Sequence, residues 1–175
     1  MKAKKKATKK AAPRKTAAKG SAIPKPLGKA RIKRILVPID FSDFSEGALA
    51  YAQPIALAFK ARIDLVYADE TNYGEIATFG PVDVELLRRN YDKESNERIK
   101  DLVQSLRAKG FKAGGVVRPG RAHQVITGVA EEQDTDLIVI ATHGHSGLEH
   151  LLMGSTAENV VRHAPCPVLS VRASA

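Results

Sequence analysis

Apolar runs of strand length alternate with helix-like segments along most of the chain. The strand-like runs, rich in Ile, Val and Leu, are 35–40, 63–68, 111–117, 136–140 and 168–171. Apolar residues at helical spacing predict helices over about 43–60, 82–109, 122–133 and 155–163. This alternation predicts an α/β fold with a parallel sheet, right-handed crossovers and helices on both faces.

Several residues mark where the helices begin and end. Ser42 or Asp43 can cap the first helix, and Glu46 follows Asp43 by three positions as in a capping box. Pro54 conflicts with the interior of that helix and is expected to bend it or loosen one turn. Gly110 is expected to end the long helix that precedes it.

The N-terminal segment is strongly basic, whereas the rest of the chain is acidic. Residues 1–34 hold 14 of the 28 Lys and Arg and none of the 19 Asp and Glu, although the whole chain is +9. The remainder is therefore acidic, with 14 basic against 19 acidic side chains. The basic pI belongs to the N-terminal segment and does not make the folded part a nucleic-acid binder.

Residues 1–31 are a mixture of Lys, Ala and Pro with no aromatic side chain. Such a segment cannot bury enough apolar surface to offset its ordering entropy, so we expect a disordered basic tail before a domain at 32–173. Two interpretations stay open. The tail either contacts nucleic acid through phosphates without reading sequence, or only improves solubility. An organellar presequence is disfavoured because an apolar face is missing.

Other targeting signals are also missing from the sequence. No run approaches the 18 or so apolar residues that would span a membrane, and no signal-peptide core follows the basic start. Cys166 is the only cysteine, which excludes an intrachain disulfide and fits a reducing, cytoplasmic location. Its position between two prolines favours a half-buried filler over a reactive thiol.

Candidate binding residues gather where the strands end. Ligand sites in open parallel sheets lie beyond the carboxyl ends of the strands. The first strand ends in Pro38, Ile39 and Asp40, the second passes through Tyr67, and the fourth runs into a glycine-rich loop at 141–155. A glycine-rich loop between a strand and a helix presents backbone N–H groups to an anion, phosphate above all.

These motifs together resemble the universal stress protein family over about residues 32–172. The similarity is carried by 37–42 (VPIDFS), by 136–140 (DLIVI), by Thr142-His143-Gly144 with nine residues before Gly154-Ser155, and by 164–169 (APCPVL). Each motif alone is weak, but their order and spacing together are specific to the family.

The resemblance implies a five-stranded sheet in the order 3-2-1-4-5, of the Rossmann-like adenine nucleotide alpha hydrolase type. It also implies a homodimer formed through the last strand and, in one branch of the family, bound ATP, with or without Mg²⁺. The ATP motif is Gly, two residues, Gly, nine residues, Gly, then Ser or Thr. Gly144, Gly154 and Ser155 match it, and Ala141 stands where the first glycine would be.

Carried across, the resemblance assigns the adenosine to the first and second strand ends, with Tyr67 standing where the main chain meets the base. It assigns the phosphates to the loop and the following helix. The implied nucleotide-binding residues are Pro38, Ile39, Asp40, Tyr67, Ile140, Ala141, His143, Gly144, Gly154, Ser155 and Thr156. A structural interpretation stays open for several of them: Asp40 could cap a helix or loop, and Ser155 could be an N-cap. His143 is expected to order the loop by hydrogen bonding.

The expected function is a nucleotide-responsive stress or regulatory module that binds ATP and is not an enzyme. A positioned Lys, metal-binding acids and a water-orienting base are not visible, although slow hydrolysis or self-phosphorylation through Glu149, His143 or Ser146 stays open. No metal site is expected from His143, His145 and His150. The alternatives are a dimer that works through protein contacts without nucleotide, and a DNA-associated stress protein that uses the tail.

Overall fold

The computed structural model describes residues 32–71, 83–143 and 153–172. The tail, residues 72–82, most of the glycine-rich loop and the last three residues lie outside this part. The elements are β1 (Arg34–Pro38), α1 (Asp43–Phe59), β2 (Arg62–Asp69), α3 (Val84–Ala108), β3 (Ala113–Pro119), α4 (Ala122–Glu132), β4 (Leu137–Ala141), α5 (Ser155–His163) and β5 (Val168–Val171).

The five strands form one sheet in the order β3-β2-β1-β4-β5, and every pair is parallel. This confirms the fold class and strand order expected from the sequence. In the register of the central pair, Val37 of β1 lies beside Leu65 of β2. On the other side Leu36 of β1 lies beside Ile138 of β4. All carboxyl ends therefore point toward one edge of the sheet.

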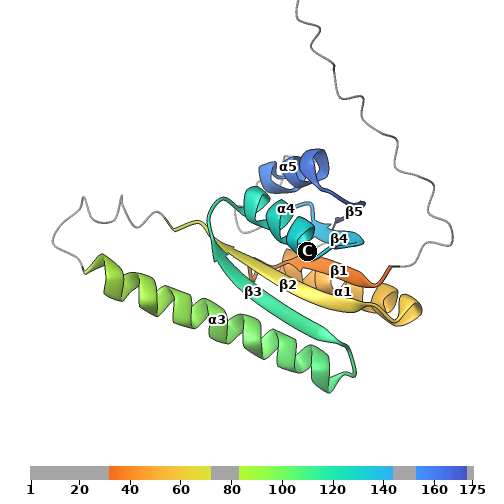
Figure 1. Ribbon diagram of the computed structural model, residues 1–175, viewed down its shortest axis with the longest axis horizontal. Coiled ribbons are helices and arrows are strands. Elements are labelled where there is room, and N and C mark those ends of the chain that lie inside the picture. The colour runs from red at the N-terminus through yellow and green to blue at the C-terminus, as the bar shows by residue number, and fades with distance from the viewer. Residues whose placement is uncertain (1–31, 72–82, 144–152, 173–175) are drawn as a thin grey trace, which may run out of the picture.

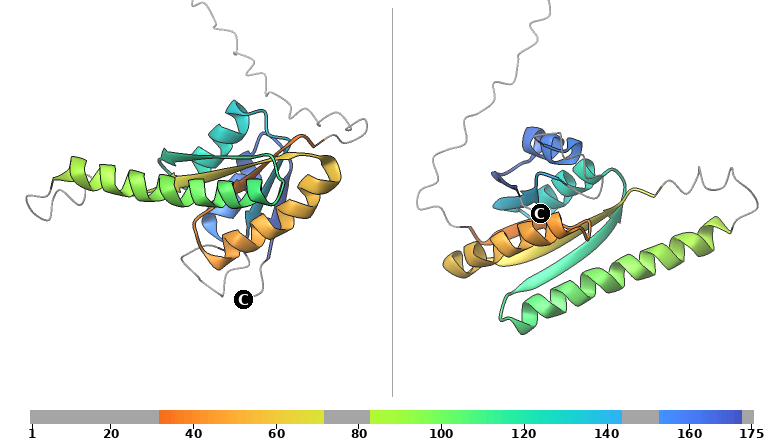
Figure 2. Two further views of the ribbon diagram at one scale, coloured as in Figure 1. Left: turned by 90° about the horizontal axis from the view of Figure 1, so that it is seen from below. Right: turned by 180° about the vertical axis from the view of Figure 1, so that it is seen from behind.

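Helices cover both faces of the sheet, as Figures 1 and 2 show from three directions. α1 and α3 pack on one face, and α4 and α5 pack on the other. The hydrophobic core is divided in the same way. Ile35 and Val37 belong to the cluster beneath α1 and α3, whereas Leu36 belongs to the cluster beneath α4 and α5. The two-residue period of β1 thus supplies apolar side chains to both layers.

The ends of the helices follow from local chemistry. Ser42, rather than Asp43, is the N-cap of α1, and its hydroxyl oxygen accepts a hydrogen bond from the N–H of Ser45 at 3.3 Å. α1 continues through Pro54 to Phe59, with Pro54 on its exposed side. The long helix stops where Gly110 takes a φ of +89°, a conformation that favours glycine.

The third strand begins and ends two residues later than the sequence pattern predicted. The N–H of Phe111 closes the last turn of α3 by donating to the carbonyl of Leu106 at 3.0 Å, so Phe111 cannot start the strand. At the other end Arg118 and Pro119, which follow the predicted run, pair with Ala68 and Asp69. Proline is tolerated there because β3 is an edge strand and Pro119 needs no ladder partner.

Cys166 is half-buried and packs against the core beneath α4 and α5. Burial raises the pKa of its thiol, and the nearby negative charge of Asp136 raises it further. Both effects disfavour the reactive thiolate. This agrees with the role of a packing residue.

No helix in the part of the chain that the structure describes is both long and apolar enough to cross a lipid bilayer.

Alanine substitutions at two glycines are expected to change the free energy of unfolding in opposite directions. A Cβ on Gly115 of β3 would lie 2.5 Å from Cγ2 of Ile99 and 3.1 Å from Cγ2 of Val103, so α3 would have to move away from the sheet. A Cβ on Gly128 inside α4 would meet nothing within 4 Å. We expect Gly115→Ala to lower the free energy of unfolding by about 1–3 kcal/mol, and Gly128→Ala to raise it by about 0.4–1 kcal/mol.

Urea unfolding monitored by circular dichroism measures both changes in the same background. Equal destabilisation by the two substitutions would contradict this account of how α3 packs on β3.

Candidate functional site

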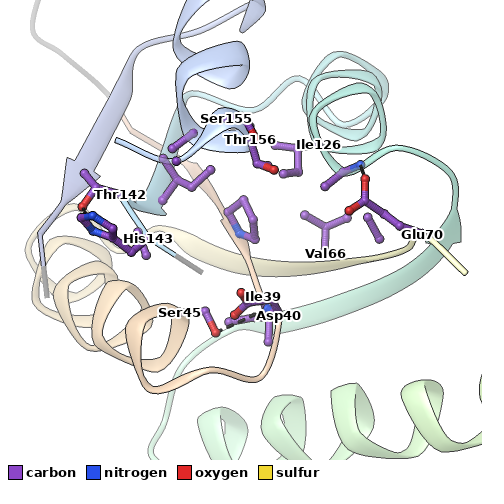
Figure 3. Close-up of a pocket in the computed structure, with 17 residues that line it drawn as sticks. Ile39, Asp40, Ser45, Val66, Glu70, Ile126, Thr142, His143, Ser155 and Thr156 are labelled. Atoms are coloured by element: carbon purple, nitrogen blue, oxygen red, sulfur yellow. Dashed lines mark hydrogen bonds between the residues drawn. The ribbon is translucent and has the colours of Figure 1, made fainter. Parts of the chain in front are cut away.

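A cavity of about 300 Å³ lies at the carboxyl edge of the sheet, where β1, β2 and β4 end and α4 and α5 begin (Figure 3). The strand order reverses at β1, and ligands of doubly wound sheets bind at such a point. The lining residues are Pro38, Ile39, Asp40, Ser45, Val66, Ala68, Glu70, Ala122, Ile126, Ile140, Ala141, Thr142, His143, Gly154, Ser155, Thr156 and Ala157.

Most residues predicted from the sequence meet at this cavity. Those that line it are Pro38, Ile39, Asp40, Ile140, Ala141, His143, Gly154, Ser155 and Thr156. Tyr67 does not line it, and Gly144 lies outside the described residues. The sequence thus identified residues from two strand ends and a helix start that lie more than a hundred positions apart in the chain.

Tyr67 faces away from the cavity because side chains alternate along β2. Its neighbours Val66 and Ala68 line the cavity, whereas the ring of Tyr67 lies against Phe41 with 4.9 Å between the ring centroids. The guanidinium of Arg98 lies 3.8 Å from the centroid of the Phe41 ring. The Tyr67 side chain therefore supports the turn after β1 from the α3 side, and a contact of its main chain with a base stays a prediction.

Asp40 has the structural role that the sequence left open, and it also forms part of the cavity wall. Its Oδ1 accepts hydrogen bonds from the N–H of Ser42 at 3.0 Å and from the hydroxyl of Ser42 at 2.5 Å. Phe41 between them has a φ of +63°, an uncommon conformation for a bulky residue. The carboxylate is thus held at a fixed place at the end of β1, beside the cavity.

Gly154 closes the base of the glycine-rich loop. Its N–H donates to the carbonyl of Thr142 at 2.7 Å, which joins the end of β4 to the start of α5. A Cβ on Gly154 would lie 3.2 Å from that same oxygen, closer than most side chains tolerate. The close approach of the two backbones accounts for glycine at this position.

The N-terminus of α5 opens toward the cavity, and no side chain of the described residues caps it. Gly154 is its N-cap residue and has no side chain to accept a hydrogen bond from the first turn. Ser155, Thr156 and Ala157 of this turn line the cavity. The first N–H groups of a helix have no partner within the helix and carry partial positive charge, so this end suits an anion.

The N-terminus of α4 differs from that of α5 because a carboxylate already occupies it. Oε1 of Glu70, just after β2, accepts a hydrogen bond from the N–H of Ala122 at 2.7 Å. Glu70 was not among the residues predicted from the sequence. The one available signal was indirect: Arg121 stands at the N-cap of α4 and supplies no cap, which left the first N–H groups available to a side chain from another element.

Ala141 and Ile140 at the end of β4 face opposite layers. Ile140 belongs to the cluster beneath α4 and α5, and Ala141 belongs to the cluster beneath α1. Ala141 is only 8% exposed. Its methyl group therefore packs largely into the α1-side core, although the residue still lines part of the cavity.

His143 is held by short-range contacts at the other side of the cavity from Glu70 (Figure 3). Its Nδ1 lies 3.0 Å from the Thr142 hydroxyl, and its ring centroid lies 5.9 Å from that of Phe44. Both contacts suit the loop-ordering role predicted for it. The other residues considered for catalysis or metal binding, His145, Ser146, Glu149 and His150, lie outside the described residues.

Residues 32–71, 83–143 and 153–172 contain no group of three or more His, Cys, Asp or Glu placed to hold a metal ion. Within this part, the cavity offers an uncapped helix N-terminus, an apolar floor and two anchored carboxylates. Such a surface suits a ligand with an anionic group at one end and a flat, largely apolar group with hydrogen-bond donors at the other.

Comparison with known proteins agrees with the geometry. The model of the universal stress protein family matches residues 31–172. A universal stress protein of Methanocaldococcus jannaschii is 34% identical over 141 residues, which are 80% of this chain and 82% of the relative. The solved structure of another protein of that organism, MJ0577, superposes with a TM-score of 0.71 at 27% identity and covers 83% of this chain and 99% of its own.

A universal stress protein solved in complex with cAMP has a TM-score of 0.62 at 23% identity. The match covers 82% of this chain and 99% of that protein. At this identity the likeness shows the shared fold.

The half-buried Tyr67 makes the stability of the fold depend on pH. Burial raises the pKa of Tyr67, and the negative charge of Asp69 raises it further. The unfolded chain then loses this proton at a lower pH than the folded protein. The contribution of Tyr67 to stability is therefore complete below about pH 10, and it is lost as the pH rises through the pKa that Tyr67 has in the folded protein.

We expect the free energy of unfolding to fall less steeply above about pH 10 in Tyr67→Phe than in the original protein. Tyr51→Phe, at a side chain that is 58% exposed, is the matched control and should keep the original slope. Urea unfolding at a series of alkaline pH values measures the slopes, and identical slopes for all three proteins would contradict the prediction.

Proposed function

The chain belongs to the universal stress protein family, and from its cavity we propose that it binds an adenine nucleotide, ATP, as a nucleotide-responsive module. The observation that carries the proposal is the uncapped N-terminus of α5, which opens into a cavity with an apolar floor. The two features suit the two halves of a nucleotide.

The phosphates would lie at the start of α5. Ser155 and Thr156 offer backbone N–H groups and hydroxyls at the positive end of the helix, and the joint between Gly154 and Thr142 holds that end beside β4. Unpaired N–H groups and the helix dipole favour an anion at such a place. The carboxylates of Asp40 and Glu70 would repel phosphate, which leaves α5 as its site.

The nucleoside would lie over the ends of β1 and β2. Ile39 and Val66 are 3% and 1% exposed and form an apolar floor, and the anchored carboxylate of Asp40 can accept hydrogen bonds from ribose hydroxyls. The cavity volume of about 300 Å³ is at the lower end of the range for small-molecule sites. A protein of the same fold in complex with cAMP supports an adenine nucleotide here.

We propose regulation rather than turnover as the use of this site. The charged and aromatic polar side chains that line the cavity already make contacts within the fold: Asp40 holds a turn, Glu70 caps α4, and His143 contacts the Thr142 hydroxyl. Groups fixed in this way can position a nucleotide. Occupancy of the site would then alter the contacts of the chain with its partners.

We also propose that two copies of the chain pair through β5. This strand is at the edge of the sheet, and Leu169 on it is 37% exposed. An edge strand presents unpaired N–H and C=O groups that a second copy can satisfy. The dimer would then contain two nucleotide sites, one in each copy of the chain.

A single charge at the start of α5 tests the nucleotide site. Ser155→Asp should weaken ATP binding about tenfold or more, because the new carboxylate lies where phosphate would bind. The same charge should stabilise α5 through its dipole by about 0.3–1 kcal/mol. Titration calorimetry with ATP and thermal unfolding without nucleotide measure the two effects, which have opposite directions.

Ser105→Asp is the matched control, since Ser105 is exposed on α3 away from the cavity. It should bind ATP as the original protein does. Unchanged ATP affinity in Ser155→Asp, or no affinity in the original protein, would refute the proposal.

A lysine on the edge strand tests the pairing. Leu169→Lys should shift the protein from dimer to monomer in sedimentation velocity, because an edge lysine is poorly tolerated between paired strands. Leu86→Lys makes the same change at a leucine that is 56% exposed on α3, and it should leave the dimer intact. A dimer that survives Leu169→Lys would exclude β5 as the interface.

A further inference from the structure

We propose that Glu70 selects the base of the bound nucleotide by accepting a hydrogen bond from its exocyclic amino group. The inference rests on the proposed function, in which a purine nucleotide occupies the cavity, and adds the residue that would distinguish a 6-aminopurine from a purine without that donor.

The first step is the asymmetry of the two helix N-termini. α4 and α5 both begin at the cavity, and among the described residues a side chain caps only α4, through Oε1 of Glu70 on the N–H of Ala122 at 2.7 Å. α5 has no side-chain cap. An anion therefore finds open N–H groups at α5 and a like charge at α4, which orients a nucleotide with its phosphates toward α5 and its base toward Glu70.

The second step is the shape of the end near Glu70. Figure 3 places Glu70 on the far side of the cavity from Thr142 and His143, close to Val66 and Ile126. Val66 and Ile126 are 1% and 3% exposed, so this end has an aliphatic floor between β2 and α4. A flat ring can lie against that floor with its edge directed at the carboxylate.

The third step is the chemistry of that carboxylate. An ionised carboxyl group only accepts hydrogen bonds and has about four acceptor sites. The Ala122 N–H occupies one of them and fixes the orientation of the group. The remaining sites would accept a hydrogen bond from an amino group on the base and would gain nothing from a C–H at the same position.

The test compares ATP with purine riboside triphosphate, which has hydrogen in place of the 6-amino group. The original protein should bind ATP roughly tenfold more tightly, because a hydrogen bond to a charged group is lost with the analogue. Glu70→Gln should bring the two affinities within about twofold of each other, because the amide oxygen keeps the Ala122 N–H and turns the NH2 group toward the base.

Glu131→Gln removes the same charge at an exposed position near the end of α4 and should keep the original preference for ATP. Thermal unfolding without nucleotide verifies that Glu70→Gln retains the cap and the fold. A purely structural Glu70 would change both affinities by the same factor.

Titration calorimetry of the full chain measures all the affinities, and each possible result either supports or overturns the inference. A preference for ATP that is lost only in Glu70→Gln supports the inference. Equal affinity of the original protein for the two nucleotides, or an unchanged preference in Glu70→Gln, overturns the inference and leaves the proposed function standing. Binding of neither nucleotide by the original protein overturns both.

Discussion

Burial of β1 on both faces is the constraint from which the position of the site follows. Ile35, Leu36 and Val37 are fully buried, and they alternate between the core beneath α1 and α3 and the core beneath α4 and α5. Two layers of helices are needed to cover such a strand. Because crossovers are right-handed, covering both faces requires the chain to add strands on both sides of β1. The carboxyl end of β1 then lies between connections that diverge, and the cavity is at that point.

The polarity of the cavity depends on how the two helices that begin there satisfy their first N–H groups. α4 takes a carboxylate from the end of β2, whereas α5 begins at a glycine that can offer none. The cavity therefore has an end that attracts anions and an end that repels them. Asp40, held by Ser42, adds a second acceptor between the apolar floor and the solvent. The difference in charge between the two ends of the cavity thus follows from the way in which the fold caps its helices.

Hydrophobic periodicity predicted the parallel sheet, and the motifs at the strand ends predicted where a site would lie. The resemblance to the family supplied the strand order and the set of predicted cavity residues. The sequence did not predict Glu70, since a cap that one element supplies to another has no local signature. Tyr67 was placed at the site, although the alternation along β2 sends its side chain to the opposite face from Val66. The shift of β3 depends on the N–H of Phe111, which the end of α3 uses. A hydrogen bond decided the differences at Glu70 and Phe111, and strand alternation decided the one at Tyr67.

Ala141 and Gly154 show which glycine of the loop motif the backbone itself requires. The backbone N–H of Gly154 reaches the carbonyl of Thr142, and any side chain at Gly154 would crowd that oxygen. Ala141 has no such contact to protect, because its methyl group packs toward the α1-side core and is nearly buried. An alanine at the end of β4 is therefore compatible with the cavity, whereas a side chain at the start of α5 would separate the two ends of the loop. The joint between β4 and α5, rather than the number of glycines, keeps the start of α5 in place beside the cavity.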